Sequence, residues 1–399
     1  MPDLPPPPTG QLTPPPLGHR LREVTGFFLK LGFIAFGGPA AHIAMMDNEV
    51  VRRRGWVTHE EFLDLLGAAN LIPGPSSTEL AIYLGRQRAG WRGLLLAGVC
   101  FILPAMMLVL TLAMAYRHFG ALPEVGWLLY GVKPVIIAIV LQALWNLGRT
   151  AVKGPLTAAV GVAAVALSFL GGNLLVILFG SGLALLAVTA LRGASGRLTG
   201  MAAWGVLGLL QPVAPAMAAA GLAAPVSLWV LTGVFLKVGA ILFGSGYVLL
   251  AFLRADLVQH LGWLTDHQLI DAIAVGQVTP GPVFTTATFI GYLVAGLPGA
   301  VLATVGIFLP SFVLVAVTYP IIPGLRRSRW TAAFLDGVNV ASLGLMAAVT
   351  WYLAQAALVD PVTIGTGVIA AGVIFRWRVN SAWLVLGGAV MGLGVHLLR

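Results

Sequence analysis

The chain has 399 residues, of which 58% are hydrophobic and only 9% are charged, with a formal net charge of +9. An ordinary soluble domain carries about 25% charged residues, so this composition excludes a soluble globular protein and indicates an all-α protein that crosses a membrane many times. The single cysteine excludes an intrachain disulfide and a thiolate metal cluster, and we expect neither a metal nor a cofactor.

The N-terminal segment, residues 1–19, is rich in proline and lacks the apolar stretch of a signal peptide. We expect it to be a disordered cytoplasmic tail. Beyond it, apolar runs of about 20 residues, enough to span the hydrocarbon core, recur along the chain. The short loops between them carry the basic residues, which we interpret as markers of orientation and not as a nucleic-acid-binding surface. Examples of the runs are Gly93–Tyr116, Trp127–Leu147 and Ser227–Phe252.

The sequence contains an internal repeat. Phe28–Gly32 returns as Phe235–Gly239, and Pro73-Gly74-Pro75 returns as Pro280-Gly281-Pro282, both 207 residues later. After the second match one residue is lost, and the spacing falls to 206. Shared apolar composition does not reproduce glycines and prolines at one spacing. We therefore predict a first transmembrane repeat at 20–200, a linker helix at 201–226 and a second transmembrane repeat at 227–399.

The basic loops indicate that the two repeats have opposite orientations. The first repeat carries Arg52–Arg54 where the second has Gln259–Leu261, which contains neither lysine nor arginine. The bias later reverses, because Arg326–Arg329 corresponds to a neutral loop after Phe119. With positive charge held inside, we predict inverted repeats, a cytoplasmic N-terminus and a C-terminus outside.

The region from Phe27 to Gly85 and its copy allow two topologies. If each copy contains two full spans, the chain crosses the membrane about 13 times, whereas re-entrant hairpins would give about nine crossings. The arginines at Arg52–Arg54 favour the hairpins, and the length of the region favours full spans. The sequence leaves both topologies open.

Each Pro-Gly-Pro sequence interrupts an apolar region, because proline removes a backbone donor and glycine permits conformations closed to other residues. Irregular backbone at membrane depth is tolerated only within protein or along a watery cavity. A helix that starts at such a break directs its free N–H groups and positive dipole end at it, which favours an anion; the alternative is a kink that serves packing. The substrate-binding candidates here are Asn70, Pro73, Gly74, Pro75, Ser76 and Ser77 in the first repeat and Gln277, Pro280, Gly281, Pro282, Thr285 and Thr286 in the second.

Lys30 and Lys237 occupy equivalent positions in the first apolar segment of each repeat. A lysine near the bilayer centre costs on the order of 3 kcal/mol, so this pair points to a role in binding or guiding an anion. The alternative is that both side chains reach the nearest interface. A glycine break follows each lysine and is a further candidate for contact with the substrate. The residues of these breaks that we include in the site are Gly37, Gly38, Gly244 and Ser245.

The acidic residues suggest a coupling group and structural ion pairs. Glu79 has no acidic counterpart, because Thr285 and Thr286 occupy its place in the second repeat. We consider it a candidate for proton coupling. Asp64 and Asp271 are equivalent, and we expect them to pair with arginines near the membrane interface.

The paired signatures Phe36-Gly37-Gly38-Pro39 and Ile72-Pro73-Gly74-Pro75, with Gly276–Pro282 in the second half, resemble those of the long, two-domain chromate ion transporters. The resemblance covers the chain from about Arg20 to the end, and Val278–Tyr292 is its most specific stretch. It implies export of chromate, a tetrahedral dianion, across the bacterial cytoplasmic membrane, with chromate resistance as the physiological role.

The expected partners are chromate, which this resemblance implies, the lipid bilayer, and a second copy of the chain in a homodimer. Sulfate or another oxyanion is the alternative substrate. The chain has no Gly-Lys-Ser/Thr phosphate loop, so we expect transport driven by the membrane potential or an ion gradient. An intramembrane enzyme is disfavoured because His59-Glu60-Glu61-Phe62-Leu63 lacks the second histidine of a zinc protease; an anion channel is a further alternative.

Overall fold

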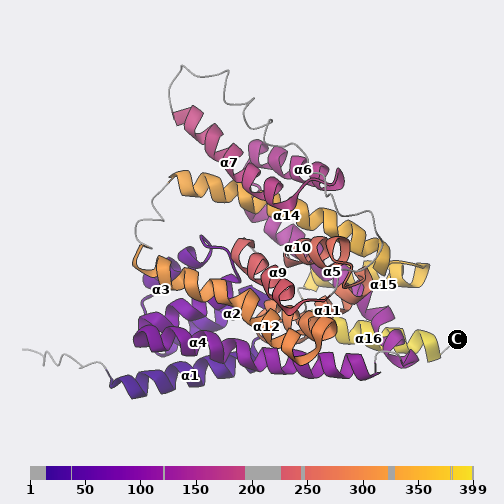
Figure 1. Ribbon diagram of the computed structural model, residues 1–399, viewed down its shortest axis with the longest axis horizontal. Coiled ribbons are helices and arrows are strands. Elements are labelled where there is room, and N and C mark those ends of the chain that lie inside the picture. The colour runs from indigo at the N-terminus through magenta and orange to yellow at the C-terminus, as the bar shows by residue number, and fades with distance from the viewer. Residues whose placement is uncertain are drawn as a thin grey trace, which may run out of the picture.

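The computed structural model describes residues 15–36, 38–119, 122–193, 226–243, 248–321, 329–377, 379 and 381–397. Every regular element in these ranges is a helix (Figure 1), and five of the helices are long and apolar enough to cross a membrane. The all-α prediction is therefore confirmed. The first repeat forms α1 (Leu17–Ile34), α2 (Gly38–Met46), the π-helix η1 (Asp47–Arg53), α3 (His59–Ala69), α4 (Ser76–Phe119), α5 (Pro123–Ala151), α6 (Pro155–Phe169) and α7 (Leu174–Gly193). The second repeat forms α9 (Leu228–Ile241), α10 (Leu249–Leu253), the π-helix η2 (Arg254–His260), α11 (Asp266–Val278), η3 (Val283–Thr285), α12 (Thr286–Thr318), η4 (Tyr319–Ile321), α14 (Arg329–Ala357), α15 (Pro361–Trp377) and α16 (Ser381–Leu397).

The duplication extends to the irregular parts of the backbone. Each repeat places a seven-residue π-helix shortly before a glycine with positive φ, which is 60° at Gly55 and 63° at Gly262. Helices α3 and α11 then begin with the same capping box, built on Thr58 in the first repeat and on Thr265 in the second. The two repeats are therefore one structural unit built twice.

Helices α4 and α12 each fold back on themselves. Gly90 has φ 66° and ψ −152°, and the equivalent Gly296 has φ 64° and ψ −153°, so both leave helical geometry. A methyl group on Gly85 would overlap the backbone oxygen of Gly93, although eight residues of straight helix would separate the two by about 12 Å. The chain therefore reverses at Gly90, and glycines allow the two antiparallel segments to touch.

Each repeat begins with two short helical hairpins, and in the first repeat their ends meet at one face. Arg88, just before the reversal of α4, pairs with Glu23 of α1 at 2.6 Å and lies over the ring of Trp56, just before α3. Arg54, at the end of η1, lies over Trp56 and over Phe27 of α1. Helix α3 has 11 residues, about 16 Å at 1.5 Å per residue, which is half of a hydrocarbon core of about 30 Å. A helix of this length does not cross the core by itself, whereas α1 has 18 residues, and both topologies stay open.

The two repeats run in opposite directions. The end of α4 reaches the reversal of the second repeat, where Arg117 lies over the ring of Tyr292. The end of α12 reaches the reversal of the first repeat, where Arg86 lies over the ring of Tyr319. Each long segment therefore starts at its own reversal and ends at that of its partner. The repeats are antiparallel, as the alternation of the basic loops predicts.

The last helices of each repeat pack on the opposite repeat. Helices α6 and α7 lie along α14 (Figure 1), whereas α15 and α16 pack on α5. The closest approaches use glycines, since a methyl group on Gly131 of α5 would overlap the backbone of Gly388, and one on Gly337 of α14 would overlap that of Ser181. This exchange joins the two repeats into one body.

The run Ser227–Phe252, which the sequence presents as one apolar stretch, is not a single helix. Helix α9 ends at Ile241, Leu242 and Phe243 after it are not helical, and α10 begins at Leu249. The predicted site residues Gly37, Gly244 and Ser245, residues 1–14 of the tail and residues 201–225 of the linker lie outside the described residues.

Candidate functional site

The two Pro-Gly-Pro turns connect the repeats. The amide of Gly74 donates a 2.7 Å hydrogen bond to the carbonyl of Leu242 after α9, and the amide of Gly281 donates a 2.9 Å bond to the equivalent Ala35 after α1. The φ angles of the two glycines are 138° and 87°, which residues with a side chain rarely adopt. Each turn is therefore inserted against the tip of the first hairpin of the other repeat.

A cavity of ≈540 Å³ lies beside the first turn, and we call it the pocket. It extends from the tips of the hairpins toward the C-terminal end of α5 and the N-terminal half of α14. Two predicted binding residues, Asn70 and Ser76, line it. The polar residues of the lining are Asn70, Ser76, Gln142, Asn146, Thr150, Lys153, Asp336, Asn339 and Ser342.

The pocket offers hydrogen-bond donors at one end and a cation at the other. Helix α4 begins at Ser76, so its first amides and its positive dipole end lie at the break beside the pocket. Lys153, whose side chain is 60% exposed, pairs with Asp336 at 2.6 Å. Amide and hydroxyl side chains lie between them. This arrangement suits a ligand that carries negative charge and accepts hydrogen bonds.

A buried histidine that sequence analysis missed links the first hairpin to the start of α4. The Nε2–H of His42 donates a 3.0 Å hydrogen bond to the carbonyl of Ala35, and its Nδ1 therefore accepts from the hydroxyl of Ser77 at 3.2 Å. The same carbonyl accepts from Gly281. A lone histidine in an apolar segment was the available signal, but its counterpart Leu249 is apolar, so the repeat did not mark it.

Glu79 is fully buried at the first turn. Its Oε1 accepts a 3.3 Å hydrogen bond from Ser311 of α12, and its Oε2 has no partner among the described residues. A methyl group on Gly74 would overlap this carboxyl group. Because an unpaired buried charge is costly, the position suits a carboxyl group that holds a proton. Its role in proton coupling stays a prediction.

At the second Pro-Gly-Pro turn the predicted polar residues are buried and form hydrogen bonds within the protein. Thr285 and Thr286 donate their hydroxyls to the carbonyls of Pro282 and Val283, each at 2.8 Å. These hydroxyls therefore satisfy backbone carbonyls at the break in the helix. Gln277, the counterpart of Asn70, is only 6% exposed. In this conformation the second turn has no open equivalent of the pocket at these residues.

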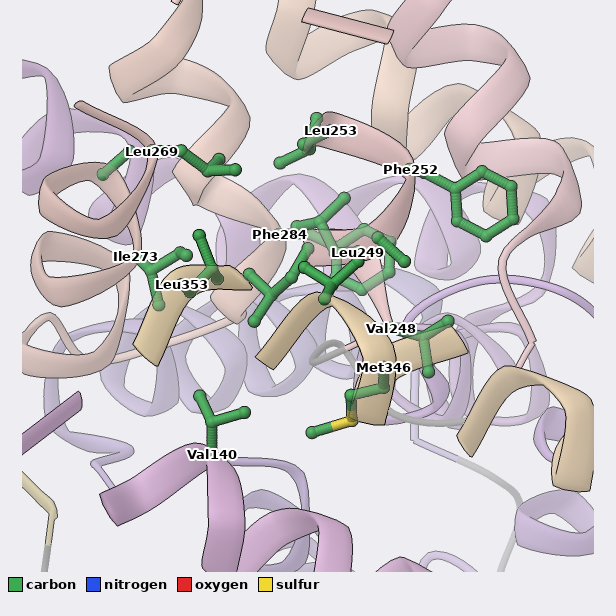
Figure 2. Close-up of a cluster of buried hydrophobic side chains, with 14 of the residues drawn as sticks. Val140, Val248, Leu249, Phe252, Leu253, Leu269, Ile273, Phe284, Met346 and Leu353 are labelled. Atoms are coloured by element: carbon green, nitrogen blue, oxygen red, sulfur yellow. The ribbon is translucent and has the colours of Figure 1, made fainter. Parts of the chain in front are cut away.

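Apolar packing fills the space beside the second turn. Figure 2 shows Leu249 of α10, Phe284 of η3 and Leu353 of α14 gathered in one buried cluster. Leu353 is the counterpart of Leu147, which lines the pocket. This counterpart of a pocket residue is therefore packed among apolar side chains on the second side.

A polar contact closes this second side. The hydroxyl of Tyr130, on α5, donates a 2.6 Å hydrogen bond to Asp360 before α15, and this bond is the main cause that holds the pKa of Asp360 below its ordinary value. Tyr130 is the counterpart of Asp336, which pairs with Lys153 at the open side. Among the described residues, a hydrogen bond thus joins α5 to the start of α15 on the second side, near the place equivalent to the Lys153–Asp336 pair.

The two predicted lysines are not among the residues that line the pocket in the described structure. Lys30 is exposed on α1. Lys237 forms a 2.6 Å ion pair with Asp256 of η2, so a carboxylate already balances its charge. The anion-binding role of both lysines stays a prediction.

The expectation that Asp271 pairs with an arginine is wrong. Asp271 accepts a 2.9 Å hydrogen bond from the hydroxyl of Tyr116 and lies 3.3 Å from the ammonium group of Lys133. The reason is that Asp271 lies in the interior half of α11 and is 3% exposed, away from the basic loops. A lysine in the middle of the apolar run Trp127–Leu147 was the signal that could have identified this pair.

Comparison with known proteins agrees with this architecture. The chromate transporter family matches residues 22–188 and 229–393, one match in each repeat. The chain is 32% identical over 398 residues to the chromate transport protein of Cupriavidus metallidurans, covering 95% of this chain and 94% of that protein. It is 30% identical over 403 residues to the chromate transport protein of Pseudomonas aeruginosa, covering 96% and 94%. No solved structure matches the chain. The chain therefore belongs to the chromate transporter family.

Proposed function

We propose that this protein exports chromate from the cytoplasm across the bacterial inner membrane, driven by the membrane potential or an ion gradient, and so confers chromate resistance. Relatives that match nearly the whole chain are named chromate transport proteins, which supports chromate as the substrate. The observation that carries the proposal is the pocket between the repeats, which reaches the first Pro-Gly-Pro turn.

The chemistry of the pocket fits a tetrahedral dianion, whose oxygens accept hydrogen bonds. Asn70 and the start of α4 at Ser76 supply donors at the inner end. Lys153 supplies the cation. Its ammonium group pairs with the substrate when the anion displaces Asp336. Because Asp336 balances Lys153 in the empty pocket, the site has no excess of fixed positive charge. Such an excess would slow the release of the anion.

In this proposal the pocket faces the cytoplasm. Its open end lies at the C-terminal end of α5, next to Arg149 and Lys153, and positive charge is held inside. The same rule puts the N-terminus in the cytoplasm. Transport then requires that the pocket closes while its counterpart at the second turn opens, by a movement of the two antiparallel repeats against each other.

The membrane potential is sufficient to drive export of a dianion. Each charge that crosses 100 mV is worth about 2.3 kcal/mol, so a dianion gains about 4.6 kcal/mol. At about 1.36 kcal/mol per tenfold ratio, this supports a gradient of roughly 2000-fold in a cell that is negative inside. Export therefore does not require ATP.

The test is uptake of radiolabelled chromate into everted membrane vesicles, which expose the cytoplasmic face. Vesicles that contain the protein should accumulate chromate when respiration makes their interior positive, and an ionophore that removes the potential should abolish this uptake. Accumulation no greater than in vesicles without the protein would contradict the proposal.

Sulfate, a dianion of the same shape, is the second candidate substrate. Competition between labelled chromate and labelled sulfate in the same vesicles distinguishes the two. A channel would show single-channel conductance, which an alternating-access transporter does not. The relatives are named transport proteins, which argues against an intramembrane enzyme.

A further inference from the structure

The pocket has a counterpart with a different lining. Asn339 of α14 lines the pocket, and the repeat spacing makes Lys133 of α5 its equivalent. Both residues lie about ten positions from the start of their helices, about 15 Å along the axis, which is near the middle of a span. The open side therefore presents a neutral amide at a depth where the closed side presents a cation.

Lys133 is enclosed and only loosely paired. Its side chain is 18% exposed, that of Asp271 is 4% exposed, and the two charged groups are 3.3 Å apart. The corresponding distance is 2.6 Å in the ion pairs that Lys153 and Lys237 form. An ammonium group has three donors. The long contact with Asp271 therefore leaves Lys133 able to bind an acceptor at a shorter distance.

Asp271 has a second partner that does not depend on the lysine. The hydroxyl of Tyr116 donates a 2.9 Å hydrogen bond to its Oδ2, whereas Lys133 lies near its Oδ1. The carboxylate therefore keeps one strong hydrogen bond if the lysine turns to another anion. This arrangement suits an exchange of partners better than a fixed ion pair does.

The residues beside Lys133 are tightly packed in this conformation. Ile136 and Ile137, the counterparts of the pocket residues Ser342 and Leu343, are buried to 1% and 3% exposure. The apolar cluster of Figure 2 contains Leu353, the counterpart of the pocket residue Leu147, and lies beside the second turn. Access to the lysine therefore requires the opposite state of the transporter, in which this side opens.

We propose that Lys133 is an anion ligand of the outward-facing pocket, and that Asp271 is its ion-pair partner while that pocket is closed. This inference rests on the proposed function. When the outer side opens, a tetrahedral oxyanion replaces Asp271 as the partner of the ammonium group. The ammonium group of Lys133 then has an anionic partner in every state, and Asp271 keeps the hydrogen bond from Tyr116 when the substrate displaces it.

The test measures the KM for chromate from each side of the membrane. Right-side-out vesicles with a reversed potential present the outer pocket, and everted vesicles present the inner one. The variant Lys133→Met/Asp271→Asn removes both charges, so no buried charge is left unpaired. We expect its KM to rise at least about tenfold from the outer side, the ratio that one charge-assisted hydrogen bond supplies, and less than about threefold from the inner side.

Three further variants separate this role from a structural one. Lys133→Arg should keep the outer KM within about threefold of wild type. Arg88→Met/Glu23→Gln removes a pair outside the pocket lining whose cation is as buried as Lys133, 19% against 18% exposed, and should leave both values unchanged. Asn339→Lys adds the cation to the inner side and should lower the inner KM by about tenfold; this gain does not depend on weakening the fold.

An outer KM of the wild-type value in the neutralised double variant would overturn the inference, and so would an equal rise on both sides. An unchanged inner KM in Asn339→Lys would also overturn it. Wild-type vesicles that carry neither chromate nor sulfate would instead refute the proposed function on which the inference rests.

Discussion

The substitution Gly281→Ala tests whether the second Pro-Gly-Pro turn connects the repeats. Gly281 has φ 87°, and alanine in the left-handed region costs about 1–2 kcal/mol. Its new methyl group would lie 2.7 Å from Cβ of Ala105 and 3.3 Å from the carbonyl oxygen of Gly32. Because helices fix both neighbours, overpacking adds about 1–3 kcal/mol. We therefore expect a total loss of about 2–5 kcal/mol in the free energy of unfolding.

Two glycine variants provide matched controls for the thermal unfolding of the purified protein in detergent. Gly38→Ala has the same backbone strain at φ 75° but no atom within 4 Å of the new methyl group, so it should lose only about 1–2 kcal/mol. Gly126→Ala is helical and also meets nothing within 4 Å, so it should be neutral or slightly stabilising. If Gly281→Ala unfolded at the same temperature as Gly38→Ala, the contact between the turn and the first hairpin would contribute nothing, and the reasoning would be wrong.

Three further predictions concern transport in everted vesicles. Asn70→Ala should raise the KM for chromate about tenfold at an unchanged protein level, since it removes a neutral donor from the pocket; an unchanged KM would remove Asn70 from the site. Glu79→Gln fills the same space without titrating, so at a fixed potential its flux should no longer respond to a pH gradient, and a wild-type response would exclude Glu79 as the coupling group. Lys30→Ala should abolish most of the flux if the lysine guides the anion, and full flux at normal expression would refute that role. Lys237→Ala should do the same, and Lys237→Met/Asp256→Asn shows whether an unpaired Asp256 causes the loss.

The architecture could be predicted from the sequence because the repeat itself carries the information. Equivalent glycines and prolines indicated the duplication, and the alternation of basic loops indicated the inversion; the contact of Arg117 with Tyr292 and that of Arg86 with Tyr319 now show the antiparallel arrangement. The sequence indicated a separate span from Gly93 and so implied a reversal before it, but it did not predict the close packing of the two segments of α4. This packing depends on the contact of Gly85 with Gly93. Comparison of the two repeats shows that these glycines recur, but it does not show which residues they contact.

The site could be predicted only in part, because its composition depends on which helices meet. Asn70 and Ser76 were identified because they flank a break in the backbone, a local feature. Asn339 and Lys153 line the same pocket from α14 and the end of α5, which are remote in sequence and carry no motif. Neither Lys30 nor Lys237 lines this pocket, so the anion-binding role that their equivalent positions suggested stays a prediction.

The exchange of helices between the repeats has a consequence for biogenesis. The first repeat is synthesised and inserted before the second exists, yet the amide of Gly74 and one surface of α5 find their partners in the second repeat. The early half must therefore persist in the lipid as an incomplete intermediate with unfilled contact surfaces. The two helices inserted last, α15 and α16, complete the packing of α5. A stop codon that removes only these two helices should thus destabilise α5, which is made about 200 residues earlier. Protein quality control in the membrane would then act on a defect far from the mutation.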